Sequence, residues 1–196
     1  MPANGLMEIV FIVSGAGPMQ VIWNDAAAGL NDFVRDQKKL PGRAQLTLVL
    51  FDHVHELIYD GSSLDEVKPL HANPYTAGGD NAVLDAVGKT IGYVRERLGK
   101  TPEGEKPGQV VVVVLTDGHD RASSDFTYKE IAGMIGREQR ERGWKFFLAT
   151  SAADPPGMAG ALSIEVDKAY RFEPTGTGIR KLLLDLHGPI AALRAA

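Results

Sequence analysis

Three short segments carry residues that could do chemistry, and each adjoins an apolar run. They are SGAGP at residues 14–18, GDN at residues 79–81 and DGH at residues 117–119. Glycines after a strand can turn the backbone around a phosphate group. Carboxylates and hydroxyls can instead hold a hard divalent cation such as Mg²⁺. The residue types therefore pose a choice between a phosphate site and a cation site.

The phosphate interpretation requires the dinucleotide fingerprint G-x-G-x-x-G, followed about 20 residues later by an acidic residue at the end of the second strand. Gly15 and Gly17 match the first two glycines, but Gln20 stands at the third. Asp36 lies at the right distance, yet it falls inside an expected helix. Two requirements fail, so a nucleotide-dependent Rossmann-type enzyme is the weaker alternative.

Other catalytic patterns are missing as well. The sequence has no G-x-x-x-x-G-K-[ST] loop, no G-x-S-x-G elbow and no cysteine. Ser14 stands where an aspartyl phosphatase of the haloacid dehalogenase type would place its nucleophile. We therefore expect a protein that is not an enzyme and has no catalytic residues.

The elements that must position these segments alternate between strands and helices. Apolar runs predict strands at 7–13, 45–51, 109–116, 144–151 and 169–172, and helical periodicity predicts helices at 20–39, 84–98, 128–135 and 179–193. Residues 55–59 follow the second strand so closely that they must form an antiparallel hairpin with it. This predicts a three-layer α/β/α Rossmann-like fold, a single domain over residues 1–196, with a mostly parallel sheet and one antiparallel edge strand.

Ligands of such sheets bind beyond the carboxyl ends of the strands, where the strand order reverses. Loops 14–19, 76–81 and 117–121 should meet at that edge. Elsewhere, Thr127 and Glu130 predict a capping box, residues 155–157 predict a loop, and Gly188-Pro189 should kink or break the last helix.

The stretches "LPGRAQLTLVLFD", "GGDNAVLDAVG", "VVVVLTDGHDRAS" and "GWKFFLAT" occur in an order and spacing that resemble a von Willebrand factor type A (vWA) domain. The chain is similar in particular to stand-alone bacterial and phage-type members, and the resemblance covers about residues 7–186. It implies the same open sheet, with helices on both faces.

The family usually carries a metal-ion-dependent adhesion site (MIDAS), whose pattern is D-x-S-x-S, a Thr in the middle loop and an Asp after the fourth strand. The resemblance places Ser14, Ala16 and Pro18 at the first three positions. Asp80, or Asn81 with a shift of one residue, stands for the Thr, and Asp117 alone is unchanged. The adhesion site is therefore expected to be degenerate.

Two outcomes follow for metal binding. In the preferred one the site binds no cation and no cofactor. In the alternative, Ser14, Asp80 and Asp117 still hold Mg²⁺ or Mn²⁺ weakly, mostly through water, and the ion engages an acidic partner.

The function expected from the resemblance is that of a protein-binding or scaffolding module. Its binding surface would be the strand-end rim, which comprises residues 14–19, 77–81 and 117–121. The rim residues selected as candidates are Ser14, Gly15, Ala16, Gly17, Pro18, Gly79, Asp80, Asn81, Asp117 and His119.

Composition limits the classes of partner that the protein is expected to bind. A net charge of −4 and a pI near 5.7 argue against nucleic acid, and the longest apolar run is too short to span a membrane. The amino terminus does not resemble a signal peptide, and the absence of cysteine fits a reducing compartment. We therefore expect a cytoplasmic protein whose partner is another protein.

Several polar and aromatic residues have ordinary explanations. His53 and His55 fit a surface turn better than a metal site, and Asp85 fits helix packing or capping. Asp120 is interpreted as a solvated loop residue. Trp23 and Trp144 are expected to pack in the core.

Overall fold

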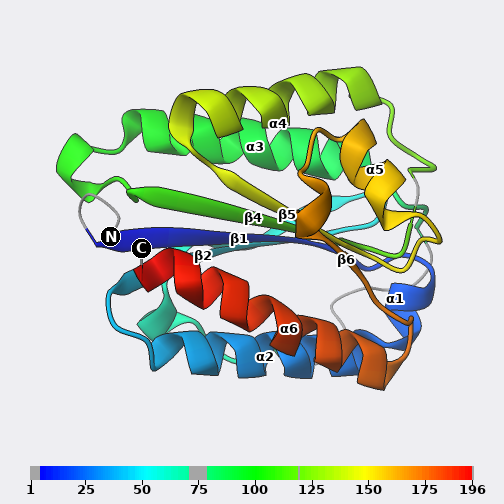
Figure 1. Cartoon of the computed structure of the whole chain (residues 1–196), viewed down its shortest axis with the longest axis horizontal. Coiled ribbons are helices and arrows are strands. Elements are labelled where there is room, and N and C mark those ends of the chain that lie inside the picture. The colour runs from blue at the N-terminus through cyan, green and yellow to red at the C-terminus, as the bar shows by residue number, and fades with distance from the viewer. Residues whose placement is uncertain (1–4, 71–78, 119, 196) are drawn as a thin grey trace.

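The computed structural model describes residues 5–70, 79–118 and 120–195, which form one sheet between two helical layers (Figure 1). The six strands are ordered β3-β2-β1-β4-β5-β6. Their bounds are β1 Leu6–Ser14, β2 Arg43–Phe51, β3 His55–Ser63, β4 Gln109–Thr116, β5 Lys145–Thr150 and β6 Ala169–Arg171. All neighbours are parallel except β2 and β3. The predicted mostly parallel sheet with an antiparallel edge strand is confirmed.

The strand register aligns the ends that carry the candidate segments. Ser14 of β1 lies beside Phe51 of β2, and Val13 lies beside Leu115 of β4. The chain runs from β1 to β2 on one side and later returns to β4 on the other, so the strand order reverses at β1. The carboxyl ends of these strands therefore open the crevice where ligands of such sheets usually bind.

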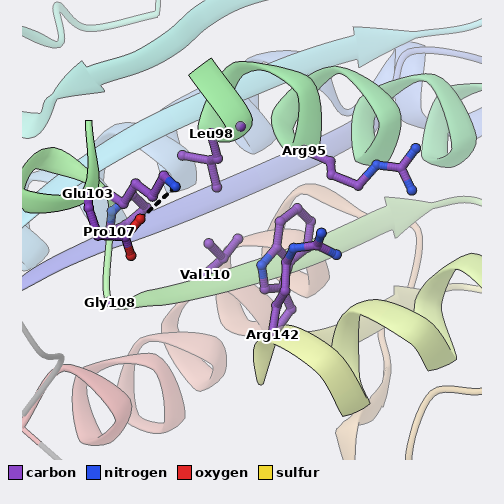
Figure 2. A pocket seen from close by; sticks show the side chains of 10 residues that line it. Arg95, Leu98, Glu103, Pro107, Gly108, Val110 and Arg142 are labelled. Carbon is purple, nitrogen blue, oxygen red and sulfur yellow. Dashed lines mark hydrogen bonds and ion pairs between the residues drawn. The ribbon is translucent and has the colours of Figure 1, made fainter. Parts of the chain in front are cut away.

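One helical layer consists of α3 Val83–Lys100, α4 Tyr128–Arg142 and α5 Pro155–Ala161 (Figure 1). These helices pack on Val10 and Ile12 of β1 and on alternate residues of the other strands. Near the carboxyl ends of α3 and α4 lies a cavity of about 360 Å³, bounded among others by Leu98, Val110 and Arg142 (Figure 2).

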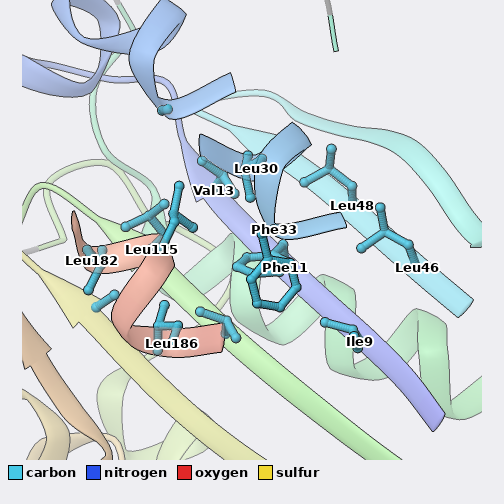
Figure 3. Packing of buried hydrophobic residues seen from close by; sticks show 14 of the residues in the cluster. Ile9, Phe11, Val13, Leu30, Phe33, Leu46, Leu48, Leu115, Leu182 and Leu186 are labelled. Atoms are coloured by element: carbon cyan, nitrogen blue, oxygen red, sulfur yellow. The ribbon is translucent and has the colours of Figure 1, made fainter. Parts of the chain in front are cut away.

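The second layer consists of α2 Trp23–Lys38 and α6 Gly176–Ala195, preceded by the short helix α1 Pro18–Val21. It packs on the other face of β1, where Phe11 meets Phe33 of α2 edge to face at 5.2 Å between ring centres (Figure 3). Because β1 is buried along its whole length, it buries apolar residues on both faces, as a central strand of a parallel sheet does.

Two departures from the sequence prediction concern where helices begin. The helix expected over residues 20–39 is divided at Ile22, whose ψ of 9° lies outside the helical range. The segment 155–157, expected to be a loop, begins α5 instead. Asp154 caps this helix by accepting the N–H of Gly157 at 3.0 Å, and proline is tolerated in a first turn because its missing N–H would have no helical partner there.

Two further departures concern length. The α6 helix continues through Pro189 to Ala195, because Leu186 and Ile190 are fully buried on either side of the proline and packing holds the helix together. The edge strand β3 extends to Ser63, four residues beyond the expected end, with irregular pairing around Leu48. The capping box of α4 is confirmed, since Thr127 and Glu130 each accept the other's backbone N–H.

Candidate functional site

The first loop of the crevice directs its only hydroxyl inward. Ser14 is fully buried, and its Oγ accepts the backbone N–H of Ala16 at 3.2 Å. The N–H of Gly15 donates to the carbonyl of Phe51 at 2.7 Å, which ties the loop to the end of β2. The Ser14 hydroxyl therefore supports the local turn.

Gly17 makes the sharpest turn of this loop and precedes α1. Its φ of 52° and ψ of −131° form a combination that residues with a side chain rarely adopt. A β-carbon on Gly17 would lie 2.5 Å from Oδ2 of Asp117. The loop after β1 and the loop after β4 are thus in direct contact through these two residues.

The other oxygen of Asp117 is held by Asn81. The Asn81 Nδ2 donates to Asp117 Oδ1 at 3.0 Å, to Thr116 Oγ1 at 2.9 Å and to the Gly118 carbonyl at 3.2 Å. The carboxylate and the carbonyl can only accept, so this arrangement also fixes which end of the Asn81 amide faces Asp117. A buried amide donor therefore occupies the centre of the crevice.

The electrostatics of Asp117 follow from its partial burial. Burial raises the pKa of Asp117 above the usual range for aspartate, and the nearby charge of Arg121 acts against this rise. The Arg121 backbone N–H also donates to the carbonyl of Asn81 at 2.8 Å. The third loop is consequently joined to the middle loop at two points.

Asp80 and Gly79, the other candidates of the middle loop, have surroundings that differ from those of Asn81. Asp80 is exposed and makes no hydrogen bond to another residue in the described ranges. Gly79 lies against the end of β2, where an added β-carbon would approach Nδ1 of His53 and the carboxylate of Asp52. His119 and residues 77–78 of the expected rim lie outside the described residues, as does residue 76 of the middle loop.

A cluster next to the crevice was not predicted in detail from the sequence. Asp85 of α3 accepts the backbone N–H groups of Ser124, Asp125 and Phe126, each at 3.0 Å. Asp120 in turn accepts the N–H of Leu84 at 3.3 Å. The loop after β4 and the start of α3 therefore cap each other. This agrees with the expected role of Asp85, whereas Asp120 is held by hydrogen bonds.

Two other residues can be placed. His55 begins β3 and contacts Thr90 Oγ1 at 3.0 Å with a partly buried ring, so it is not the surface-turn residue that was expected. Asp36 lies in the last turn of α2, paired with Lys39 at 2.7 Å and away from the end of β2. Trp23 and Trp144 are buried, as expected.

The described residues offer few ligands to a hard cation. Ala16 and Pro18 bring no side-chain oxygen, Ser14 is turned inward, and the group facing Asp117 is an amide donor. Within the described ranges, no group of three or more His, Asp or Glu side chains could hold a metal ion. Among the described residues, direct protein ligands for Mg²⁺ are thus few, and water would have to complete most of its octahedron.

Comparison with solved structures shows which known fold this architecture matches. Proximal thread matrix protein 1 from the mussel byssus superimposes with a TM-score of 0.65 at 16% identity, over 95% of this chain and 46% of that chain. A second structure of it, with a zinc-occupied MIDAS motif, gives 0.63 at 14% identity, over 96% and 46%. The ArnB paralog VWA2 from Sulfolobus acidocaldarius gives 0.57 at 19% identity, over 94% and 46%.

The chain has the vWA fold. It spans about half the length of each of these neighbours. No protein-family model matches the sequence, and no curated protein sequence matches it either. In the ranges that the structure describes, no helix has the length and apolar character needed to cross a membrane.

Proposed function

We propose that this vWA domain is a non-enzymatic protein-binding module whose strand-end rim engages its partner without a metal ion. The observation that carries the proposal is the bond from Asn81 Nδ2 to Asp117 Oδ1. An amide donor supplies the positive end of a dipole to the carboxylate, where the fold family would place a cation. The same donor group would repel a cation that approached Asp117.

Exposed apolar side chains near the crevice support a protein partner. Val21 in α1 is 87% exposed, and Val54 in the turn after β2 is 55% exposed. Both follow the carboxyl ends of strands that border the crevice. Protein interfaces combine apolar side chains with polar groups, and both kinds are present beside this crevice.

Calorimetric titration with Mg²⁺, Mn²⁺ and Zn²⁺ tests the metal-free part of the proposal. Zinc is included because one mussel structure has a zinc-occupied motif. The proposal predicts no saturable heat for the wild type. Saturable heat that disappears in Asp117→Ala would favour the alternative, in which a weakly held cation engages an acidic partner. A nucleotide-linked rise in melting temperature with NAD, NADP or ATP would instead favour the enzyme interpretation.

Site-specific photo-crosslinking tests the binding surface. A photoreactive residue replaces Val21 near the crevice, and a matched variant carries it at Leu184, which is 70% exposed on α6. In cells of the source organism, the Val21 variant should yield a discrete protein adduct that persists in chelator, and the Leu184 variant should not. Equal labelling at both positions, or none at either, would contradict the proposed surface.

A further inference from the structure

A second cavity lies at the opposite end of the sheet from the crevice. It measures about 370 Å³ and lies between the starts of β1 and β2 and the ends of α2 and α6. Leu6, Ala44 and Leu64 contribute buried apolar surface to its walls. Its polar lining includes Gln37, Lys38, Arg43 and Arg194.

Gln37 is the first of these groups. Its side chain is fully buried, and its Oε1 accepts a hydrogen bond from Arg194 Nη1 at 3.0 Å. Because an arginine can only donate, this bond determines which end of the Gln37 amide is the oxygen. The remaining end, Nε2, is buried and has no acceptor among the described residues. A buried donor without an acceptor is costly, so an oxygen supplied by a ligand would stabilise this end of the amide.

Arg194 is the second group. It is 8% exposed, and among the described residues its acceptors are oxygen atoms of uncharged groups: Gln37 Oε1 and the carbonyls of Gln37, Pro41 and Gly42. No carboxylate in the described part of the chain forms an ion pair with it. Burial lowers the pKa of Arg194 below its usual value. The carbonyls at and just after the end of α2 stabilise the cation, but no carboxylate in the described ranges neutralises its charge.

Most of the other charged side chains of this cavity have the same sign as Arg194. Lys38 and Arg43 line it together with Arg194, whereas Asp65 is the single acidic residue among the lining side chains. One proton of Lys38 Nζ is used by the carbonyl of Val67 at 3.2 Å. In a chain with a net charge of −4, this is a local excess of positive charge.

The cavity near α3 and α4 provides a contrast (Figure 2). There Arg142 pairs with the buried Glu138 at 2.7 Å, Arg95 lies 3.9 Å from the same carboxylate, and Lys106 pairs with Glu103 at 2.8 Å. Its cations are thus matched by carboxylates within the protein. The cavity at Gln37 lacks that internal match for its most buried cation.

We propose that the cavity at Gln37 is a binding site for a small oxyanion, either a carboxylate or a phosphate. Gln37 Nε2 is enclosed in the structure, so a small rotation of its side chain must accompany binding before one ligand oxygen can accept from it and satisfy the buried donor. The charges of Arg194, Lys38 and Arg43 favour the anion, and the apolar wall accommodates a short carbon skeleton. The site is separate from the strand-end rim, so the proposal does not depend on the proposed function.

Titration followed by ¹H–¹⁵N NMR tests the site, with acetate and inorganic phosphate in separate arms and sodium chloride at matched ionic strength as control. The proposal predicts a saturable shift of the Gln37 side-chain amide with at least one oxyanion and none with chloride. The two arms distinguish a carboxylate ligand from a phosphate ligand. Absence of a saturable shift in both arms overturns the proposal, and a solvent molecule then satisfies Gln37.

Gln37→Glu provides the decisive variant. It keeps the acceptor for Arg194 and replaces the unsatisfied donor by an internal carboxylate oxygen. Oxyanion binding should weaken by about tenfold or more, because a hydrogen bond to a charged ligand is lost and repulsion is added. The melting temperature without oxyanion should rise, because Arg194 gains a counterion.

Matched variants keep the test decisive. Gln20→Glu makes the same charge change on α1 at the opposite end of the sheet and should leave oxyanion binding unchanged. If Gln37→Glu fails to fold, Arg43→Ser replaces it and should weaken binding through loss of a cavity-lining charge. Undiminished binding in whichever variant folds overturns the proposal.

Discussion

The carboxylate of Asp117 packs against the α-carbon of Gly17, and Oδ2 occupies the space into which a side chain at residue 17 would project. This contact joins the loop after β1 to the loop after β4 across the point where the strand order reverses. It is possible only because residue 17 has no side chain. The close approach of these two loops thus depends on the glycine at residue 17.

Replacing Gly17 by Ala should therefore destabilise the protein. An alanine at φ 52° and ψ −131° carries backbone strain of about 1–3 kcal/mol. The added β-carbon also displaces the Asp117 carboxylate and loosens its bond to Asn81. Urea unfolding of the variant measures the combined loss in free energy of unfolding.

Gly118→Ala is the matched control for that prediction. Gly118 lies in the same crevice, but an added β-carbon meets nothing within 4 Å and the residue has no positive φ. Its substitution should change stability by less than about 0.5 kcal/mol. Equal effects of the two substitutions would show that the contact between Gly17 and Asp117 is unimportant for stability.

The raised pKa of Asp117 predicts a stability cost at neutral pH. The folded state holds the proton to higher pH than the unfolded state, so stability falls as pH rises from the ordinary aspartate pKa through the folded value. Above the pKa of Asp117 in the folded state, the full loss of stability is reached. Asp117→Asn keeps an acceptor for Asn81 without the charge and should be more stable than wild type at pH 7, with the difference shrinking on acidification.

Asp125→Asn should show the opposite sign. Lys89 hydrogen-bonds the Asp125 carboxylate and lowers its pKa, so the ionised form stabilises the folded state above the unfolded pKa and this contribution is lost as pH falls. The variant should be slightly less stable than wild type at pH 7 and similar to it in acid. Urea unfolding between pH 3 and 7 measures the free energy of unfolding of both variants. If Asp117→Asn has a lower free energy of unfolding than wild type at pH 7, the argument that burial destabilises the charged Asp117 is wrong.

Asp85→Asn should disrupt the caps between α3 and the loop after β4. One carboxylate oxygen accepts the N–H groups of Asp125 and Phe126, and the other accepts that of Ser124. An asparagine retains one acceptor and presents a donor to another donor, at a cost of about 1–3 kcal/mol. Asp32→Asn, which breaks an exposed pair with Arg35, should cost less than about 0.5 kcal/mol in the same unfolding assay.

The fold was largely predictable because its signals are local. The apolar runs and the short turn before His55 determined the strands, their order of appearance and the antiparallel edge. Positions that depend on distant partners were not predictable. Glu8 interrupts an apolar strand, but its partner Arg97 lies 89 residues away, and only the folded sheet brings them together. Likewise, Pro189 stays helical because of tertiary packing.

The candidate site was predictable in place and less so in detail. The carboxyl ends of the predicted strands located the crevice, and the missing hydroxyls at Ala16 and Pro18 were evident from the sequence. The role of Asn81 was not, because a sequence does not show which end of an amide faces a carboxylate. The hydrogen bonds of Asp120 depend on a loop that folds back on α3, for which the sequence has no periodic signal.

Restoring the oxygen ligands should restore metal binding. A variant with Ser14→Asp, Ala16→Ser, Pro18→Ser and Asn81→Thr supplies the pattern that the vWA resemblance implies and removes the amide donor opposite Asp117. Without metal this variant should be less stable than wild type, because Ser14 is fully buried and an aspartate there would carry an unpaired charge. Mn²⁺ at 100 times its dissociation constant should then raise the free energy of unfolding of this variant by about 2.7 kcal/mol, and leave that of wild type unchanged.

Adding Asp117→Ala to the variant should abolish the effect of Mn²⁺, because the carboxylate on the opposite side of the crevice is then gone. An equal response of wild type to Mn²⁺ would mean that Asn81 does not exclude the ion, and that a hydrated cation can bind beside Asp117 with few protein ligands.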